Sequence, residues 1–170
     1  MAVSSVANSE TFRVTTPSDR EIVFTRLFSA PRRLVFEAMT RPEHVRQWWG
    51  ILDDRYTLTV CDIDLRPGGA WRWVGRGPQG PFAFRGEYRE IAPPDRLVYT
   101  EIYEPFPDVE SEVRAIFADE HGKTRLTVTA SYPSREVRDA VMKTGMESGA
   151  AISYDRLEEV ARELAQSAAR

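Results

Sequence analysis

The chain has 170 residues, 42% of them hydrophobic and 29% charged, which is typical of one soluble globular domain. Its 23 basic and 26 acidic residues give a net charge of −3, which argues against nucleic-acid binding because phosphate neutralisation needs a basic surface. The single cysteine, Cys61, excludes an internal disulfide. The sequence has neither a run of about 20 apolar residues nor a signal-like start, so we expect a cytoplasmic protein without a membrane span.

The first fifty residues divide into an arm, a strand and two short helices. Residues 1–18 are small and polar without periodicity, so we predict a flexible N-terminal arm followed by a single domain over residues 19–170. Hydrophobic and polar residues alternate over residues 20–29, which predicts a strand. Pro31 suits the first position of a helix, and a second helix is predicted from Pro42 to a stop at Gly50.

From residue 52 onward the hydrophobic period changes to two. This pattern predicts six more strands in a meander, over residues 57–65, 70–76, 82–91, 96–104, 109–118 and 124–132. A long C-terminal helical region is predicted after Ser134, a plausible N-cap, with interruptions at Gly145 and Gly149. The fold class predicted by this order is α+β, with a curved seven-stranded antiparallel sheet whose one face is covered by helices.

The aromatic residues fall on one face of the predicted sheet. If residues 77–80 form the hairpin turn, Trp73 lies opposite Phe84 and Trp71 opposite Gly86, which leaves room for the Trp71 indole. Such a face either fills a core or lines an apolar cavity with polar tips. The small residues Gly149, Ala150 and Ala151 favour a cavity. Its predicted lining is Trp48, Trp71, Trp73, Phe82, Phe84, Tyr88, Tyr99, Glu101, Tyr103, Phe117, Met142, Met146, Ala150 and Tyr154.

Glu101 is the unusual member of this face, because strand alternation places its carboxylate among Leu97, Tyr99 and Tyr103. Such a group is either paired, or has a raised pKa and is a candidate general acid or base. Alternatively, a twist or bulge brings Glu101 to solvent. It is the only catalytic candidate, and no catalytic constellation is evident.

The remaining chemistry-bearing residues predict no metal site and no cofactor. Neither His44 nor His121 has a second potential metal ligand at the sequence spacing typical of metal sites. Cys61 is expected to be a small buried residue. Arg72 and Arg85 fall on the face opposite the aromatic residues. They form either a partner-binding patch or a solvated face.

Five stretches taken together resemble one family. They are Ala-Pro…Val-Phe-Glu-Ala-Met-Thr-Arg-Pro-Glu…Trp-Trp-Gly over 30–50, Asp-Leu-Arg-Pro-Gly-Gly-Ala-Trp-Arg over 64–72, the strand pair over 86–100, Thr-Arg-Leu-Thr-Val over 124–128, and Met-Glu-Ser-Gly…Leu over 146–157. In order and spacing they resemble the SRPBCC superfamily, and within it the group named after the activator of heat-shock protein 90 ATPase. The resemblance covers about residues 20–165.

This resemblance implies a START-like or birch-pollen-allergen-like helix-grip fold, in which a seven-stranded sheet grips a long C-terminal helix over an apolar cavity. Members bind lipids, hormones or polyketides, and a few catalyse cyclisation or dehydration. Two departures stand out. The family often has Trp where this chain has Ala150, and often an aromatic residue where it has Glu101.

Three hypotheses of function follow. The first is binding of an apolar or aromatic small molecule, lipid-like or polyketide-like, in the cavity. The second is a cyclase or dehydratase that uses Glu101. The third is a co-chaperone-like interaction module that uses the surface around Arg72 and Arg85, although residues 1–18 offer no counterpart of the chaperone-binding domain of the eukaryotic co-chaperone. A homodimer stays open.

Overall fold

One antiparallel sheet forms the frame of the molecule. The computed structural model describes residues 11–169. Eight strands follow the spatial order β1-β2-β8-β7-β6-β5-β4-β3, which is an antiparallel meander with the N-terminal pair added at one end. Their bounds are β1 Phe12–Thr15, β2 Glu21–Phe28, β3 Thr57–Ile63, β4 Ala70–Gly77, β5 Gly80–Ala92, β6 Arg96–Tyr103, β7 Glu110–Glu120 and β8 Lys123–Ser131.

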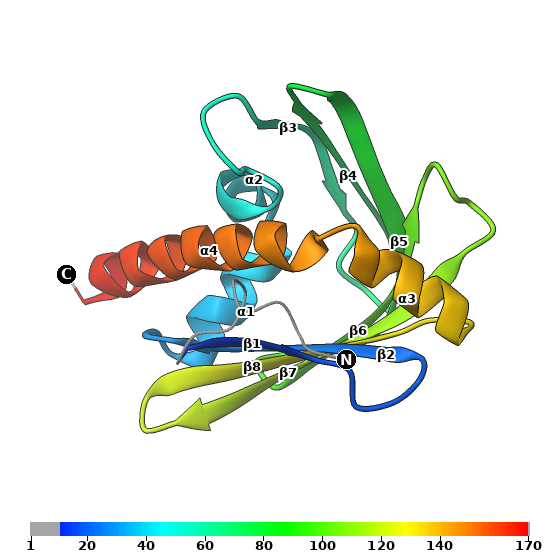
Figure 1. The fold of residues 1–170 in the computed structure, drawn as a ribbon. Coiled ribbons are helices and arrows are strands. Elements are labelled where there is room, and N and C mark those ends of the chain that lie inside the picture. The colour runs from blue at the N-terminus through cyan, green and yellow to red at the C-terminus, as the bar shows by residue number, and fades with distance from the viewer. Residues whose placement is uncertain (1–10, 170) are drawn as a thin grey trace.

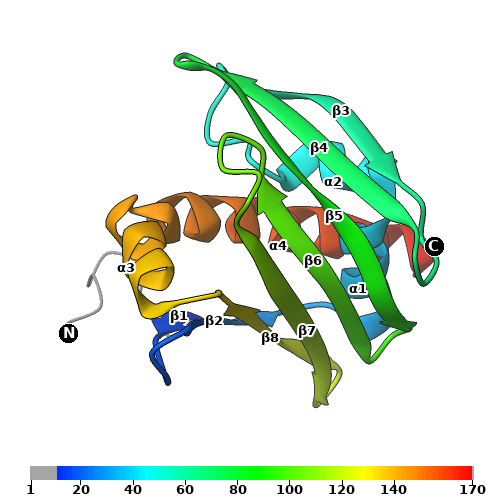
Figure 2. The same cartoon turned by 90° about the vertical axis from the view of Figure 1, so that its right-hand side faces the viewer.

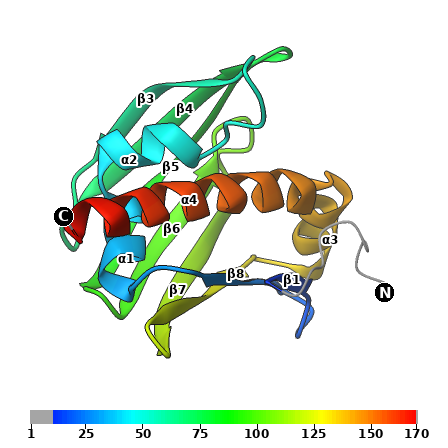
Figure 3. The same cartoon turned by 90° about the vertical axis from the view of Figure 1, so that its left-hand side faces the viewer.

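The sheet curves around a long helix, as the two perpendicular views in Figure 1 and Figure 2 show. The helices are α1 Arg32–Thr40, α2 Pro42–Trp48, α3 Arg135–Lys143 and α4 Met146–Ala168. Both α1 and α2 contact α4, and Figure 3 shows the three helices on the concave side of the sheet. No helix in the described part of the chain is long and apolar enough to cross a membrane. The predicted α+β helix-grip architecture is therefore confirmed.

The sheet has one strand more than predicted. Phe12–Thr15 forms β1, which pairs with β2, and the side chains of Phe12 and Val14 are 2% and 1% exposed. The prediction of a flexible arm over residues 1–18 is wrong for these four residues, because the inward side chains of β1 are part of the core. Residues 1–10 of the predicted arm lie outside the described residues.

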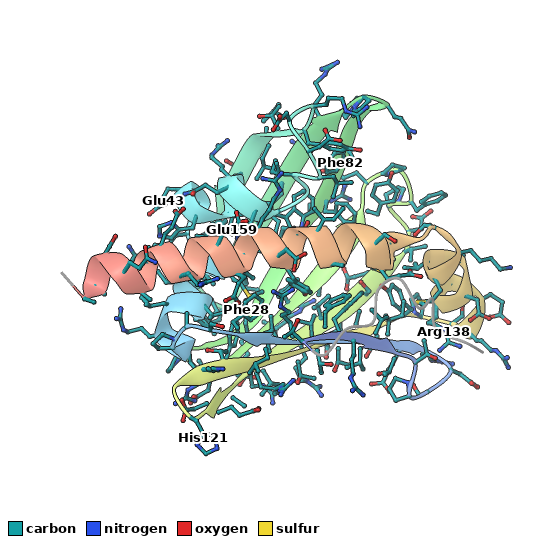
Figure 4. The ribbon with its side chains drawn as sticks, turned by 60° about the vertical axis from the view of Figure 1, so that its left-hand side comes forward. Phe28, Glu43, Phe82, His121, Arg138 and Glu159 are labelled. Atoms are coloured by element: carbon teal, nitrogen blue, oxygen red, sulfur yellow. The ribbon has the colours of Figure 1, made fainter. Side chains whose placement is uncertain are left out.

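Strand alternation places the hydrophobic core between the sheet and α4. On β7 buried and exposed residues alternate over almost the whole strand, and Val113, Ala115 and Phe117 point inward. The inward residues pack against Leu157 and Ala161 of α4, which are both fully buried. Figure 4 shows Phe28 of β2 in the space between its strand and α4, and His121 at the far tip of the β7–β8 hairpin.

The C-terminal helical region bends once. Ser134 accepts a hydrogen bond from the backbone N–H of Val137, at 3.2 Å, so the predicted N-cap of α3 is confirmed. Gly145 has a φ of 73°, a left-handed conformation that glycine adopts without strain, and it separates α3 from α4. Gly149 does not interrupt the helix, contrary to prediction, because it lies within the first turns of α4.

The pairing of β4 with β5 follows the predicted register. Gly77 pairs with Gly80, Trp73 with Phe84, and Trp71 with Gly86. The predicted alignment of the aromatic residues on one face is therefore confirmed for this hairpin. A register shift between Tyr88 and Glu90, in the pairing of β5 with β6, then turns Ile91 rather than Glu90 inward.

Candidate ligand-binding site

Aromatic rings from three neighbouring strands form a continuous wall on the concave face. The ring centroids of Trp71 and Trp73 lie 5.0 Å apart, and those of Trp71 and Tyr99 lie 5.6 Å apart in an edge-to-face arrangement. Tyr99 in turn contacts Tyr88 at 6.2 Å. Phe84 joins the wall through Trp49, whose ring contacts both Phe84 and Trp73. Such contacts fix the rings relative to one another.

One glycine allows this wall to form. The indole N–H of Trp71 crosses β5 at Gly86 and donates to the carbonyl oxygen of Thr100 on β6, at 3.1 Å. A Cβ atom on Gly86 would lie 2.6 Å from the Trp71 indole nitrogen and 1.8 Å from that carbonyl oxygen. The backbone N–H of Glu87 meanwhile donates to the Thr100 hydroxyl, at 3.0 Å. The ladder between β5 and β6 is therefore interrupted beside Glu101.

Glu101 lies on the concave face, next to Tyr99 along β6. Tyr99 pairs with Val113 and Glu101 with Ser111, and both partners on β7 are buried. The register between β6 and β7 is regular here, so no bulge in this pairing turns the carboxylate to the outer face. No hydrogen bond or ion pair joins the Glu101 carboxylate to any residue within 11–169.

Three tyrosines surround this carboxylate, and together with it they are called the Glu101 cluster: Tyr99 on β6, Tyr132 directly after β8, and Tyr154 on α4. Burial raises the pKa of Glu101 to about 7. Burial, and secondarily the Glu101 charge, raises the pKa of Tyr99, Tyr132 and Tyr154.

All four side chains of the cluster are nevertheless only partly buried. Among residues 11–169, the only fully buried side-chain nitrogen or oxygen atoms without a partner are Trp73 Nε1 and Glu147 Oε2. The oxygen atoms of the Glu101 cluster, which likewise lack protein partners, must therefore keep accessible surface. The cluster therefore keeps some contact with solvent, although protein surrounds Glu101 closely enough for burial to raise its pKa.

The helix side of the site centres on Tyr154. Its ring packs against Trp48 at 6.4 Å and against Phe28 at 6.2 Å. Trp48 is fixed in turn, because its indole N–H donates to the carbonyl oxygen of Ala38 at 2.9 Å. Two turns before Tyr154, on the same side of α4, lies Glu147, which is 6% exposed. Partly buried residues with small or flexible side chains fill this stretch of α4: Met146, Ala150 and Ala151.

Four other residues of the predicted cavity lining occupy different surroundings, and Tyr103 also packs against Phe84 of the aromatic wall, at 4.9 Å. Phe82 and Tyr103 line a small open pocket of about 240 Å³ at the tip of the β4–β5 hairpin, where Figure 4 shows Phe82. Phe117 is 1% exposed and packs against Phe36 of α1, at 5.2 Å, so it belongs to the closed core. Met142 lies on α3 and is packed against the core.

Tyr132 of the Glu101 cluster and the buried Glu147 of α4 were not predicted from the sequence. Tyr132 continues the inward alternation of Leu126, Val128 and Ala130, so the same parity could have found it. The sequence pattern does not predict that Glu147 is buried, because its burial depends on how the first turn of α4 packs against the rest of the protein.

Three other side chains that the sequence singled out lie on β3, β4 and β5. Cys61 is 4% exposed, as predicted for a small buried residue, and burial raises its pKa to about 11. In residues 11–169, no three His, Cys, Asp or Glu side chains gather where they could hold a metal ion. On the outer face, Arg72 and Arg85 share one partner, Glu104, which lies 2.6 and 4.0 Å from them. Their charge is thus partly neutralised.

The curved antiparallel sheet and the long C-terminal helix on its concave side define a helix-grip protein of the START-like class. The chain matches the family model described as "Activator of Hsp90 ATPase homolog 1-like protein" over residues 29–162. It belongs to this family. No curated protein matches the sequence at a significant level.

Solved bacterial structures share the fold. A protein from Rhodobacter sphaeroides is 27% identical with a TM-score of 0.81, and the match covers 90% of this chain and 99% of that one. A Mycobacterium smegmatis protein is 26% identical with a TM-score of 0.76, over 87% and 96% of the two chains. A protein from Aeromonas hydrophila described as AHSA1-like is 18% identical with a TM-score of 0.59, over 84% and 94%.

Proposed function

We propose that this protein binds an apolar or aromatic small molecule between the concave face of its sheet and α4. The observation that carries the proposal is the Glu101 cluster, whose four polar ends keep accessible surface but have no protein partner in the described chain. Polar groups in a protein interior are normally satisfied, so such a set is the expected lining of a site that a ligand or water occupies.

The surroundings of the cluster supply the apolar part of the site. Trp71, Trp73 and Tyr88 lie on the sheet side, and Ala150 lies on the helix side. Burial of apolar ligand surface against such walls favours binding by a free energy of roughly 25 cal/mol per Å², before the costs of association are subtracted. The few polar tips would then set the orientation of the ligand.

Native mass spectrometry of the freshly purified protein tests the proposal, with the denatured spectrum as control. We expect a reproducible non-covalent excess mass of a few hundred daltons that disappears on denaturation. A bare native mass, together with no binding of the probe molecules described below, would overturn the proposal.

A second function, acid–base catalysis on the bound molecule, is favoured by one observation. Burial raises the pKa of Glu101 to about 7, where a carboxyl group exchanges protons most effectively at neutral pH. The test is a Glu101→Gln variant with a molecule that the wild-type protein converts. If the variant binds that molecule without converting it, Glu101 is catalytic, and unchanged turnover would exclude this role.

A further inference from the structure

The Glu101 cluster presents a carboxylate without a counter-charge. Neither Arg nor Lys contributes to the pKa of Glu101, which burial alone raises. Arg26 is the buried cation of β2, but it pairs with Asp155 of α4 at 2.5 Å and lies over the ring of Phe28. Its charge is therefore already neutralised.

A second buried carboxylate lies on α4. Glu147 is 6% exposed, and its Oε2 atom has no hydrogen-bond partner among residues 11–169. Because seven residues make two helical turns, Glu147 lies on the same side of α4 as Tyr154, about 10 Å away along the helix. Tyr154 in turn belongs to the Glu101 cluster. The Glu147 charge has no part in the raised pKa of Glu101, so of these two carboxyl groups only Glu101 is assigned to the cluster.

Aromatic rings supply the rest of this environment. Tyr99 and Tyr154 are members of the cluster. The rings of Trp71 and Tyr99 pack edge to face. Aromatic faces attract cations, and organic ammonium groups are commonly bound by aromatic side chains together with a carboxylate. An anionic ligand would instead meet the uncompensated Glu101 carboxylate, and among residues 11–169 no cation of the cluster could pair with it.

We propose that the bound molecule is an organic cation, an apolar or aromatic skeleton carrying one protonated amine whose ammonium group donates to the Glu101 carboxylate. This inference rests on the function proposed above and names the chemical class of its ligand. The aromatic wall around Trp71 and Trp73 takes the skeleton. Glu101 takes the ammonium group, because a buried charge is stable only when it is paired.

Three probe molecules with one skeleton test this proposal: 4-phenylbutylamine, 4-phenylbutanol and 4-phenylbutyrate. Their binding to the intact protein is measured by isothermal titration calorimetry at pH 8, where most Glu101 is ionised. We expect the amine to bind about tenfold to a hundredfold more tightly than the alcohol, the range of a charge-assisted hydrogen bond. The carboxylate should bind most weakly.

Two matched variants assign the preference to one residue. Glu101→Gln should lower the affinity for the amine about tenfold and leave the affinity for the alcohol nearly unchanged. Glu110→Gln is the control, because Glu110 is exposed on the neighbouring strand β7 and should leave both affinities unchanged. Circular dichroism of both variants verifies the fold.

The outcomes separate the two proposals. If amine and alcohol bind the wild-type protein equally, or the alcohol or carboxylate binds better, the cation proposal is overturned while ligand binding stands. An amine preference that survives Glu101→Gln also overturns it. If none of the three probes binds and the native mass is bare, the proposed function fails, and the cation proposal fails with it. The comparison of the three probes on the wild-type protein tests the cation proposal even if a variant does not fold.

Discussion

The indole of Trp71 on β4 donates its N–H to the carbonyl oxygen of Thr100 on β6, across the intervening strand β5. This hydrogen bond joins strands that are not neighbours, and it is possible only where β5 has no side chain. Gly86 provides that gap. The packing of the aromatic wall and the break in the ladder beside Glu101 therefore depend on the same position.

Replacement of Gly86 by alanine should destabilise the protein strongly. The added Cβ would lie 1.8 Å from the Thr100 carbonyl oxygen, which is a backbone atom and can move only with its strand. We expect a loss of about 2–4 kcal/mol in the free energy of unfolding, in the range of overpacking combined with a lost buried hydrogen bond. Urea denaturation monitored by tryptophan fluorescence measures it. A loss below about 0.5 kcal/mol, the size of an ordinary surface change, would contradict the indole contact.

Replacement of Gly149 by alanine should stabilise the protein, in contrast to the same replacement at Gly86. Gly149 lies within α4, and a Cβ there would meet only Leu52, at 3.8 Å. Alanine is favoured over glycine in a helix by about 1 kcal/mol, so Gly149→Ala should stabilise the protein by about 0.5–1 kcal/mol. The same urea titration measures the change. Destabilisation would mean that α4 starts later than Met146 or that this stretch is packed more tightly.

The stability of the protein should depend on pH through Glu101. Burial raises the pKa of this carboxyl group from 4.5 to about 7, so between these values the folded state binds more protons than the unfolded state. The free energy of unfolding therefore falls as pH rises from 4.5 to 7. Glu101→Gln removes this dependence and should be more stable than wild type at pH 8, by up to about 3 kcal/mol, with little difference at pH 4.

Parallel denaturation series at pH 4, 6 and 8 measure this effect. Glu110→Gln serves again as the control, because its side chain is exposed and its replacement should shift stability equally at each pH. A constant difference between wild type and Glu101→Gln across the series would show that Glu101 is solvated in the folded protein.

The thiol of Cys61 should be unreactive in the folded protein. It is 4% exposed, and burial raises its pKa to about 11, so about one molecule in a thousand carries the thiolate at pH 8. Ellman's reagent at pH 8 should label the protein completely in guanidinium chloride and only slowly without it. Rapid labelling of the native protein would contradict this burial.

Local rules predicted the register and faces of the central hairpin. A turn at residues 77–80 fixes the pairing of Trp73 with Phe84, and alternation then places Tyr99 and Glu101 on the concave face. β1 was missed because its four residues alternate too briefly to stand out, and its stability comes from contacts with distant parts of the chain.

The finer features of the site depend on tertiary structure. Alternation assigns Phe117 and Glu101 to the same face, but it cannot tell that Phe36 of α1 covers the first while the second keeps accessible surface. The burial of Glu147 likewise depends on the placement of α4 after the bend at Gly145. Such differences arise where elements distant in sequence meet.

The two halves of α4 are held to different extents, and this affects how the protein can evolve. Leu157, Val160 and Ala161 in the second half are within the closed core, and Asp155 anchors the middle of the helix to Arg26. The first half faces the site with partly buried residues such as Met146, Ala150 and Ala151. If the protein binds a ligand as proposed, substitutions there would reshape the binding volume at little cost to folding, and new ligand preferences would be acquired while the scaffold is preserved.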